Sequence, residues 1–93
     1  MSQFTVRVEL HKLQPGDYDV LHAEMSAQGF ERTINGEKGT YHLPTAEYNH
    51  EGSEDDPQVI LERAKAAATR VGRPFEILVT QAQRRVWLNL ERV

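Results

Sequence analysis

The sequence predicts an α+β fold in which two helices cover one face of an antiparallel sheet. Segments with the two-residue period of a strand alternate with segments of helical period, in the order β-α-β-β-α-β plus one further strand. Each helical segment carries a single apolar stripe, as expected for a helix that rests on a sheet. The pair Asn35-Gly36, a strong hairpin signal, separates the second and third strand segments.

Length and composition indicate one soluble domain. With 93 residues, the chain has room for one core, and we expect a single domain over residues 1–93. The absence of cysteine excludes disulfides and thiolate zinc sites, and suits a reducing compartment. The net charge of -3 argues against tight, nonspecific binding to nucleic acid but leaves room for a local basic face. No membrane span or signal-peptide pattern is found, so we expect a cytoplasmic protein that contacts no membrane.

The first strand and the first helix have clear boundaries. Residues 3–10 alternate in polarity, and the apolar set on one face is Phe4, Val6, Val8 and Leu10. A turn with proline and glycine leads into a helix over residues 16–28, whose first free amides Asp17 can cap. Gly29 can take the left-handed conformation that ends this helix.

The middle of the chain predicts a hairpin followed by a loop. A weaker strand covers residues 30–34, and Asn35-Gly36 supplies the turn. The third strand covers residues 39–43, and a proline that cannot donate to a sheet ends it. Residues 45–56 contain no clear period, and we expect them to be irregular.

The last third of the chain predicts a helix and two strands. Pro57 fits a first helical turn, and the carboxylates before it favour the positive end of a helix dipole. We expect this helix to run to about Val71, where Gly72 closes it. Alternating segments at residues 75–80 and 86–91 then predict two strands.

This order of elements is that of the ferredoxin-like fold, in which strands line up 4-1-3-2 with both helices on one face. The strand at 39–43 is therefore expected beside the first strand at the centre of the sheet, and the opposite face is open. The additional C-terminal strand at 86–91 is expected to extend the edge beside residues 75–80, or to pair with a second copy in a homodimer.

The open face holds two candidate catalytic residues. Strand parity places Arg7 outward on the first strand and His42 outward on its expected neighbour, so we expect the two side chains to lie close together. Arg7 can hold a phosphate, and His42 can transfer a proton near neutral pH. Such a pair could cleave RNA without a metal, with the 2′-hydroxyl as nucleophile. Alternatively, Arg7 simply pairs with Glu9 on a solvated face.

Other polar residues allow a functional and a structural interpretation. His22 lies beside the apolar stripe of the first helix. It could transfer a proton, or it could have a purely structural role. Arg84 and Arg85 could bind RNA phosphates or an acidic partner, or could keep the edge from aggregating. His42 and His50 fit no zinc motif, and we predict neither a metal site nor a cofactor.

Four segments together resemble one known family. They are Phe-Thr-Val-Arg-Val-Glu-Leu at 4–10, Asp-Tyr-Asp-Val-Leu-His at 17–22, Gln-Gly-Phe at 28–30 and Tyr-His-Leu-Pro-Thr-Ala-Glu-Tyr at 41–48. The combination resembles the GhoS-like family, the endoribonuclease antitoxins of type V toxin–antitoxin systems. The resemblance implies a ferredoxin-like fold related to the CRISPR adaptation nucleases, and RNA cleavage that silences a membrane-toxin message.

The resemblance also implies a role for a basic residue in the first helix. Alignment on Phe30 matches that position to His22, where the family has an arginine-type group. The first strand ends in Leu10-His11 and lacks the paired acidic residues of a metal-dependent relative, so any cleavage is expected to be metal-independent.

Two functions follow as expectations. The first is a GhoS-like, RNA-binding protein that acts as an antitoxin. It could do so as a metal-independent endoribonuclease with Arg7, His22 and His42 as catalytic residues. In this function Arg84 and Arg85 bind the RNA. The second is a non-enzymatic ferredoxin-like interaction module that forms a homodimer and presents its open face to a protein. The resemblance favours the first function, and the acidic balance favours the second.

Overall fold

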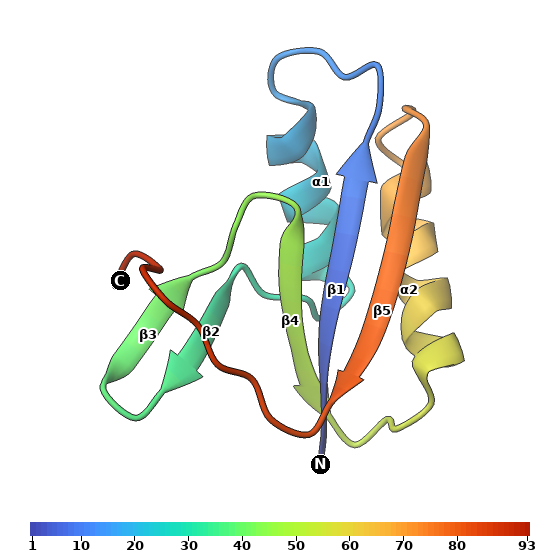
Figure 1. Cartoon of the computed structure of the whole chain (residues 1–93). Helices are drawn as coiled ribbons and strands as arrows, with labels where there is room; N and C mark the ends of the chain where they lie inside the picture. Colours follow the sequence, from blue (N-terminus) through green and yellow to red (C-terminus); the bar gives the residue numbers. More distant parts are fainter.

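The computed structural model describes all 93 residues and has the expected α+β class. In chain order its elements are β1 (Ser2–Leu10), α1 (Asp17–Ala27), β2 (Thr33–Gly36), β3 (Gly39–His42), β4 (Glu47–Gly52), α2 (Pro57–Thr69) and β5 (Phe75–Ala82). Both helices lie behind one face of the sheet β4-β1-β5, and the hairpin of β2 and β3 lies beside β4 (Figure 1). Neither α1 nor α2 has the length and the apolar content that a membrane-spanning helix needs.

β1 is the centre of the main sheet and pairs antiparallel with both neighbours. Val6 lies opposite Tyr48 of β4 and Val79 of β5, and all three side chains point toward the helices. The alternation seen in the sequence of β1 is therefore the alternation between core and open face. The largest fully buried side chains are Tyr48, Phe4, Phe30, Leu21, Met25, Ile60, Val6 and Val8.

Both helices are confirmed, with one correction at the start of α1. Gly16 holds the N-cap position with φ +88°, and no side chain caps the helix. The prediction that Asp17 caps it is wrong, because Asp17 is already inside the first turn. Its carboxylate instead accepts hydrogen bonds from the Gln14 N–H at 2.6 Å and from Arg73 Nε at 2.8 Å. In α2, Asp56 is the cap and accepts from the Gln58 N–H at 2.9 Å.

The hairpin exists, but its turn is shifted by two residues. Asn35 pairs with Thr40 and Gly36 pairs with Gly39, so Glu37 and Lys38 form the turn. The predicted turn at Asn35-Gly36 is therefore wrong. Gly39 supplies the positive φ, at +147°, that lets the shifted turn close.

The predicted central strand is also wrong. Among the strands, β3 pairs with β2 and not with β1. The strand beside β1 is β4, inside the segment expected to be irregular. β4 is built from polar residues whose period is still two. Tyr48 and His50 face the core, while Asn49 faces the other way. Because histidine and asparagine are uncommon at the buried positions of strands, the composition of residues 47–52 did not indicate a strand.

The predicted strand at residues 86–91 does not form. After β5 the chain crosses to the hairpin, where Arg92 makes an isolated bridge with Tyr41 (Figure 1). The apolar positions of the expected strand are not buried, since Val86 is 89% and Leu88 83% exposed. The edge of β5 is consequently not extended, and a homodimer through a C-terminal strand has no strand to use.

Candidate functional site

Most of the charged side chains on the open face of the main sheet are acidic. The side chains opposite the core-facing positions of β1, β4 and β5 form this face. Its carboxylates are those of Glu9, Glu47, Glu51 and Glu76. One arginine of the three strands, Arg7, lies among them with Glu47 and Leu78 as its register partners. A phosphate approaching this face would meet more negative than positive groups.

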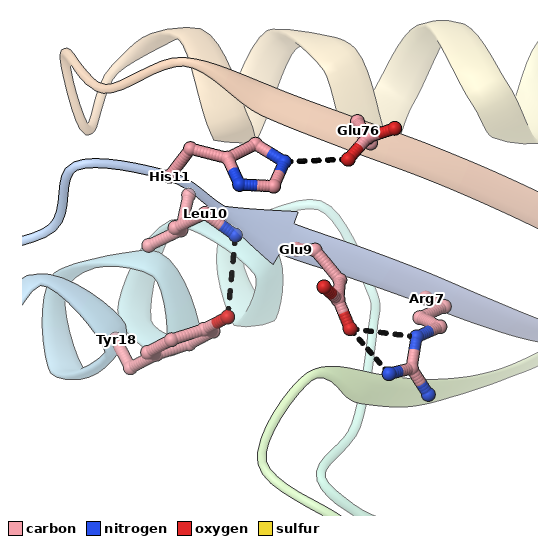
Figure 2. A network of polar contacts seen from close by, with 6 residues as sticks. All are labelled: Arg7, Glu9, Leu10, His11, Tyr18 and Glu76. Carbon is pink, nitrogen blue, oxygen red and sulfur yellow. Dashed lines mark hydrogen bonds and ion pairs between the residues drawn. The ribbon is translucent and has the colours of Figure 1, made fainter.

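Arg7 is held by a carboxylate of its own strand. Its Nε donates to Glu9 Oε1 at 3.0 Å, and a second guanidinium nitrogen contacts the same oxygen. Figure 2 shows the two side chains turned toward each other, with His11 pairing similarly to Glu76 of β5 at 2.5 Å. The hydrogen bond to Glu9 raises the pKa of Arg7. The Arg7–Glu9 ion pair on a solvated face, which the sequence left open as the alternative to a phosphate site, is therefore present in the structure.

The structure does not bring the three predicted catalytic residues together. His42 lies at the end of β3, where it pairs with Thr33, and β3 does not adjoin β1. The register that was to make His42 a neighbour of Arg7 is therefore absent. His22 lies on α1, behind the face opposite to the one that carries Arg7.

His22 belongs to a buried polar cluster on the helix side of the sheet. Its Nδ1 lies 2.5 Å from the hydroxyl of Tyr48, which is fully buried. Burial raises the pKa of Tyr48, so the hydroxyl keeps its proton and can donate it to the ring nitrogen. Burial and the nearby Arg32 lower the pKa of His22, while Asp19 acts in the opposite direction. The neutral imidazole is therefore the acceptor that holds Tyr48 in place.

Arg32 is the residue that sequence reasoning missed. Its guanidinium lies 5.4 Å from the centre of the Tyr48 ring. It also donates to two carbonyl oxygens between β3 and β4, those of Leu43 at 2.9 Å and Pro44 at 2.8 Å, and to the carbonyl of Glu47 at the start of β4. One side chain thus fixes the loop that leads into β4. No local pattern identifies it, because its partners lie more than ten residues away in sequence.

The two predicted RNA-binding arginines differ. Arg84 is exposed. Arg85 is partly buried and donates to Asn49 Oδ1 at 2.7 Å, to Thr5 Oγ1 at 3.2 Å and to the Phe4 carbonyl at 3.3 Å. Loss of hydration lowers the pKa of Arg85. Arg85 therefore fastens the C-terminal segment to the sheet.

A groove of about 640 Å³ lies where this segment passes the hairpin. Its walls include Trp87, Tyr41 and Arg85, and the two aromatic rings have centroids 5.6 Å apart. The close approach of the hairpin backbone requires a glycine, because a Cβ at Gly36 would lie 2.7 Å from the Trp87 ring. The groove is thus formed by a segment that is packed on the hairpin rather than paired in the sheet.

Gly36→Ala is expected to displace Trp87 from the hairpin. Since Trp87 is the only tryptophan, its hydration should shift the fluorescence emission to longer wavelength. Glu37→Ala, at the exposed neighbouring position, should leave the emission unchanged. An unshifted emission in Gly36→Ala would contradict the packing of this segment.

The two edges of the main sheet differ in what covers them. On the outer side of β4, Glu31 and Asn49 exchange two backbone hydrogen bonds of 2.8 Å. β5 has β1 as its only neighbour. The His11 N–H donates to the Pro74 carbonyl, and hydrogen-bonded pairs recur every second residue along an antiparallel ladder. Alternate residues of β5, beginning at Glu76, therefore bond to β1.

The other residues of β5 direct their backbone groups away from the sheet. These residues are Phe75, Ile77, Val79 and Gln81. The free edge of β5, defined by these four residues, has backbone donors and acceptors and no strand to receive them.

The chain matches no protein-family model, and no curated protein or solved structure is significantly similar to it.

Proposed function

We propose that this protein is a non-enzymatic, ferredoxin-like interaction module that adds a strand of a second polypeptide to the free edge of β5. The observation that carries the proposal is the unpaired backbone of that edge. A strand that lies along such an edge gains a ladder of main-chain hydrogen bonds, and side-chain pockets then select its sequence. The ferredoxin-like assignment is supported by the Glu31–Asn49 bridge, which adds a fourth position next to β4 in the order expected for that fold.

The chemistry of the open face favours this function over RNA cleavage. Arg7 is paired with Glu9, and Arg85 is engaged by the sheet itself. His22 accepts from a buried tyrosine behind the sheet. RNA binding and cleavage, implied by the resemblance to the GhoS-like family, is the alternative. A mixed RNA pool incubated with the wild-type chain in EDTA separates the two functions.

No cleavage is expected in that assay. Cleavage that disappears in Arg7→Ala or His42→Ala would overturn the non-enzymatic function and place a reactive group at the substituted residue. Both residues are exposed, so their substitution leaves the core intact and the comparison is direct.

Amide exchange tests strand addition to β5. The Ile77 and Val79 amides face the free edge, whereas the Leu78 amide faces β1. In dilute protein, the first two should exchange rapidly and the Leu78 amide slowly. An eight-residue peptide with the sequence of β5 is the probe, and it should slow the exchange at Ile77 and Val79. The same peptide with proline at its fifth position lacks one N–H and should have a weaker effect.

Protection that appears elsewhere on the chain, with exchange at Ile77 and Val79 unchanged, would contradict strand addition at β5. Equal effects of the two peptides would show that main-chain hydrogen bonds do not carry the binding.

A further inference from the structure

The hydrophobic core is incompletely buried on the side formed by β5. On the central strand, the core-facing residues Phe4, Val6 and Val8 are completely buried. On β5, the corresponding residues pack against the same core but stay partly exposed: Phe75, Ile77 and Val79. A neighbouring strand on the far side of β5 would cover the exposed part of these side chains, as β5 itself covers those of β1.

β5 also lacks the features that keep exposed edges apart. Edge strands usually carry lysine, proline, a bulge or several charges that discourage pairing. β5 is eight residues long, contains no lysine or proline, and has one charged residue, Glu76. Its register with β1 runs from residue 75 to residue 82 without interruption, so no bulge turns the edge away.

Leu78 adds an apolar contact on the open face of this strand. Its side chain is 64% exposed, while the neighbouring positions of the face are mostly charged or polar. Leu78 lies halfway along the chain between Phe75 and Gln81, the outermost residues of the free edge. Those positions make it the natural centre of a symmetric contact.

We infer that β5 pairs antiparallel with β5 of a second copy of this chain, about a two-fold axis that passes beside Leu78. The proposal rests on the proposed function and names the partner strand. In this register Ile77 lies opposite Val79 of the second copy, and Phe75 lies opposite Gln81. Every free N–H and C=O of the edge then has a partner, because all four residues that face outward are in hydrogen-bonded pairs.

The same register suits the side chains. Leu78 lies opposite Leu78 of the second copy in a non-hydrogen-bonded pair, where side chains approach most closely. Glu76 lies opposite Thr80, so no like charges meet. The axis is perpendicular to the sheet, which keeps both pairs of helices on one face and brings the half-exposed side chains of the two cores together.

Neighbouring registers are less favourable. A shift of two residues in either direction leaves Phe75 or Gln81 without a partner for its backbone groups. A shift of four residues toward the start of β5 also places Glu76 directly opposite Glu76 of the second copy, and like charges at opposed positions are destabilising. Charge and hydrogen bonding therefore select the same axis.

The test is the mass of the wild-type chain in solution over a range of concentrations, together with three variants. The wild type should change from the 10.6 kDa of one chain to twice that mass as concentration rises. Leu78→Glu and Leu78→Lys should each remain at the mass of one chain, because like charges meet at the axis. An equal mixture of the two should recover the doubled mass. Leu88→Glu, the same change at another exposed leucine, should behave as wild type.

Cross-linking tests the register itself. The chain has no cysteine, so Leu78→Cys introduces a single thiol. Directly opposed residues of a non-hydrogen-bonded pair lie within disulfide reach, and mild oxidation should link two chains. Leu88→Cys is the matched control and should link much less under the same conditions.

The outcomes separate this inference from the function on which it rests. A wild type that stays at the mass of one chain overturns the second-copy pairing, while peptide protection of Ile77 and Val79 would still support strand addition. A doubled mass that Leu78→Glu does not change, or cross-linking equal at Leu78 and Leu88, places the dimer contact elsewhere and also overturns it. Loss of both self-association and peptide protection overturns the inference and the proposed function together.

Discussion

Arg32→Ala is expected to lower the free energy of unfolding by about 2–4 kcal/mol, since hydrogen bonds from a charged donor are worth roughly 1.5–3 kcal/mol each and are not additive. The substitution removes the donors of three carbonyl groups, from the end of β3 to the first residue of β4, and the cation over the ring of Tyr48. The Leu43 and Glu47 bonds are partly buried, so water replaces them incompletely. Urea unfolding followed by circular dichroism measures the effect.

Two substitutions define what the Arg32 experiment means. Arg32→Lys keeps the charge but lacks the planar fork that reaches several carbonyls at once, so it should recover only part of the loss. Arg84→Ala removes an exposed arginine and should change the free energy of unfolding by less than about 0.5 kcal/mol. If Arg32→Ala were no more destabilising than Arg84→Ala, the loop before β4 would not depend on this side chain.

The elements that sequence reasoning predicted correctly have local causes. β1 and β5 alternate in polarity along their length, and α2 has its proline and its capping aspartate at adjacent positions. The period and the cap are each visible within a few residues. In these segments the local preferences of the residues agree with the final fold. Secondary structure can be predicted from sequence where that agreement holds.

The elements that could not be predicted from the sequence depend on partners that are distant along the chain. β4 is a strand because Tyr48 fits between the core and Arg32, and because His50 packs between Phe4 and Phe30. The Nδ1–H of His50 also donates to the Gly29 carbonyl at 2.9 Å. None of these contacts is visible within β4 itself. The opposite error occurs at residues 86–91, where alternation is present but the partner edge is not used.

The candidate site was predicted in part for the same reason. Strand parity depends on one strand, so the outward direction of Arg7 and its pairing with Glu9 could be anticipated. The neighbourhood of Arg7 and His42 required the order of the strands, and the wrong strand had been placed next to β1. The edge of β5 is free because the predicted last strand does not form beside it. The sequence of residues 75–82 does not indicate whether a neighbouring strand is present.

The stability of the protein is expected to fall as pH decreases from about 7 to 5, and His22 is expected to cause part of this change. Its pKa is lowered in the folded chain from the ordinary value of 6.5, chiefly by burial and further by Arg32. The unfolded chain therefore binds more protons in this window, so the free energy of unfolding rises with pH. The contribution is complete above the unfolded pKa and is lost as pH falls toward the folded one.

His22→Gln separates this titration from the packing. Glutamine does not titrate and its carbonyl can accept from the Tyr48 hydroxyl, so the pH dependence between 7 and 5 should flatten while stability near neutral pH is largely kept. His42→Gln removes an exposed histidine and should leave the dependence unchanged. Equal flattening in the two variants would assign the effect to surface charge.

His22→Ala should cost about 1–3 kcal/mol at neutral pH, because it leaves the buried hydroxyl of Tyr48 without an acceptor. The double variant with Tyr48→Phe decides whether the hydrogen bond is the cause. If it is, the alanine substitution should cost less in the phenylalanine background, where no donor remains to be satisfied. Equal costs in both backgrounds would mean that His22 stabilises the fold through the packing of its ring against Tyr48, whose centroid lies 5.5 Å away.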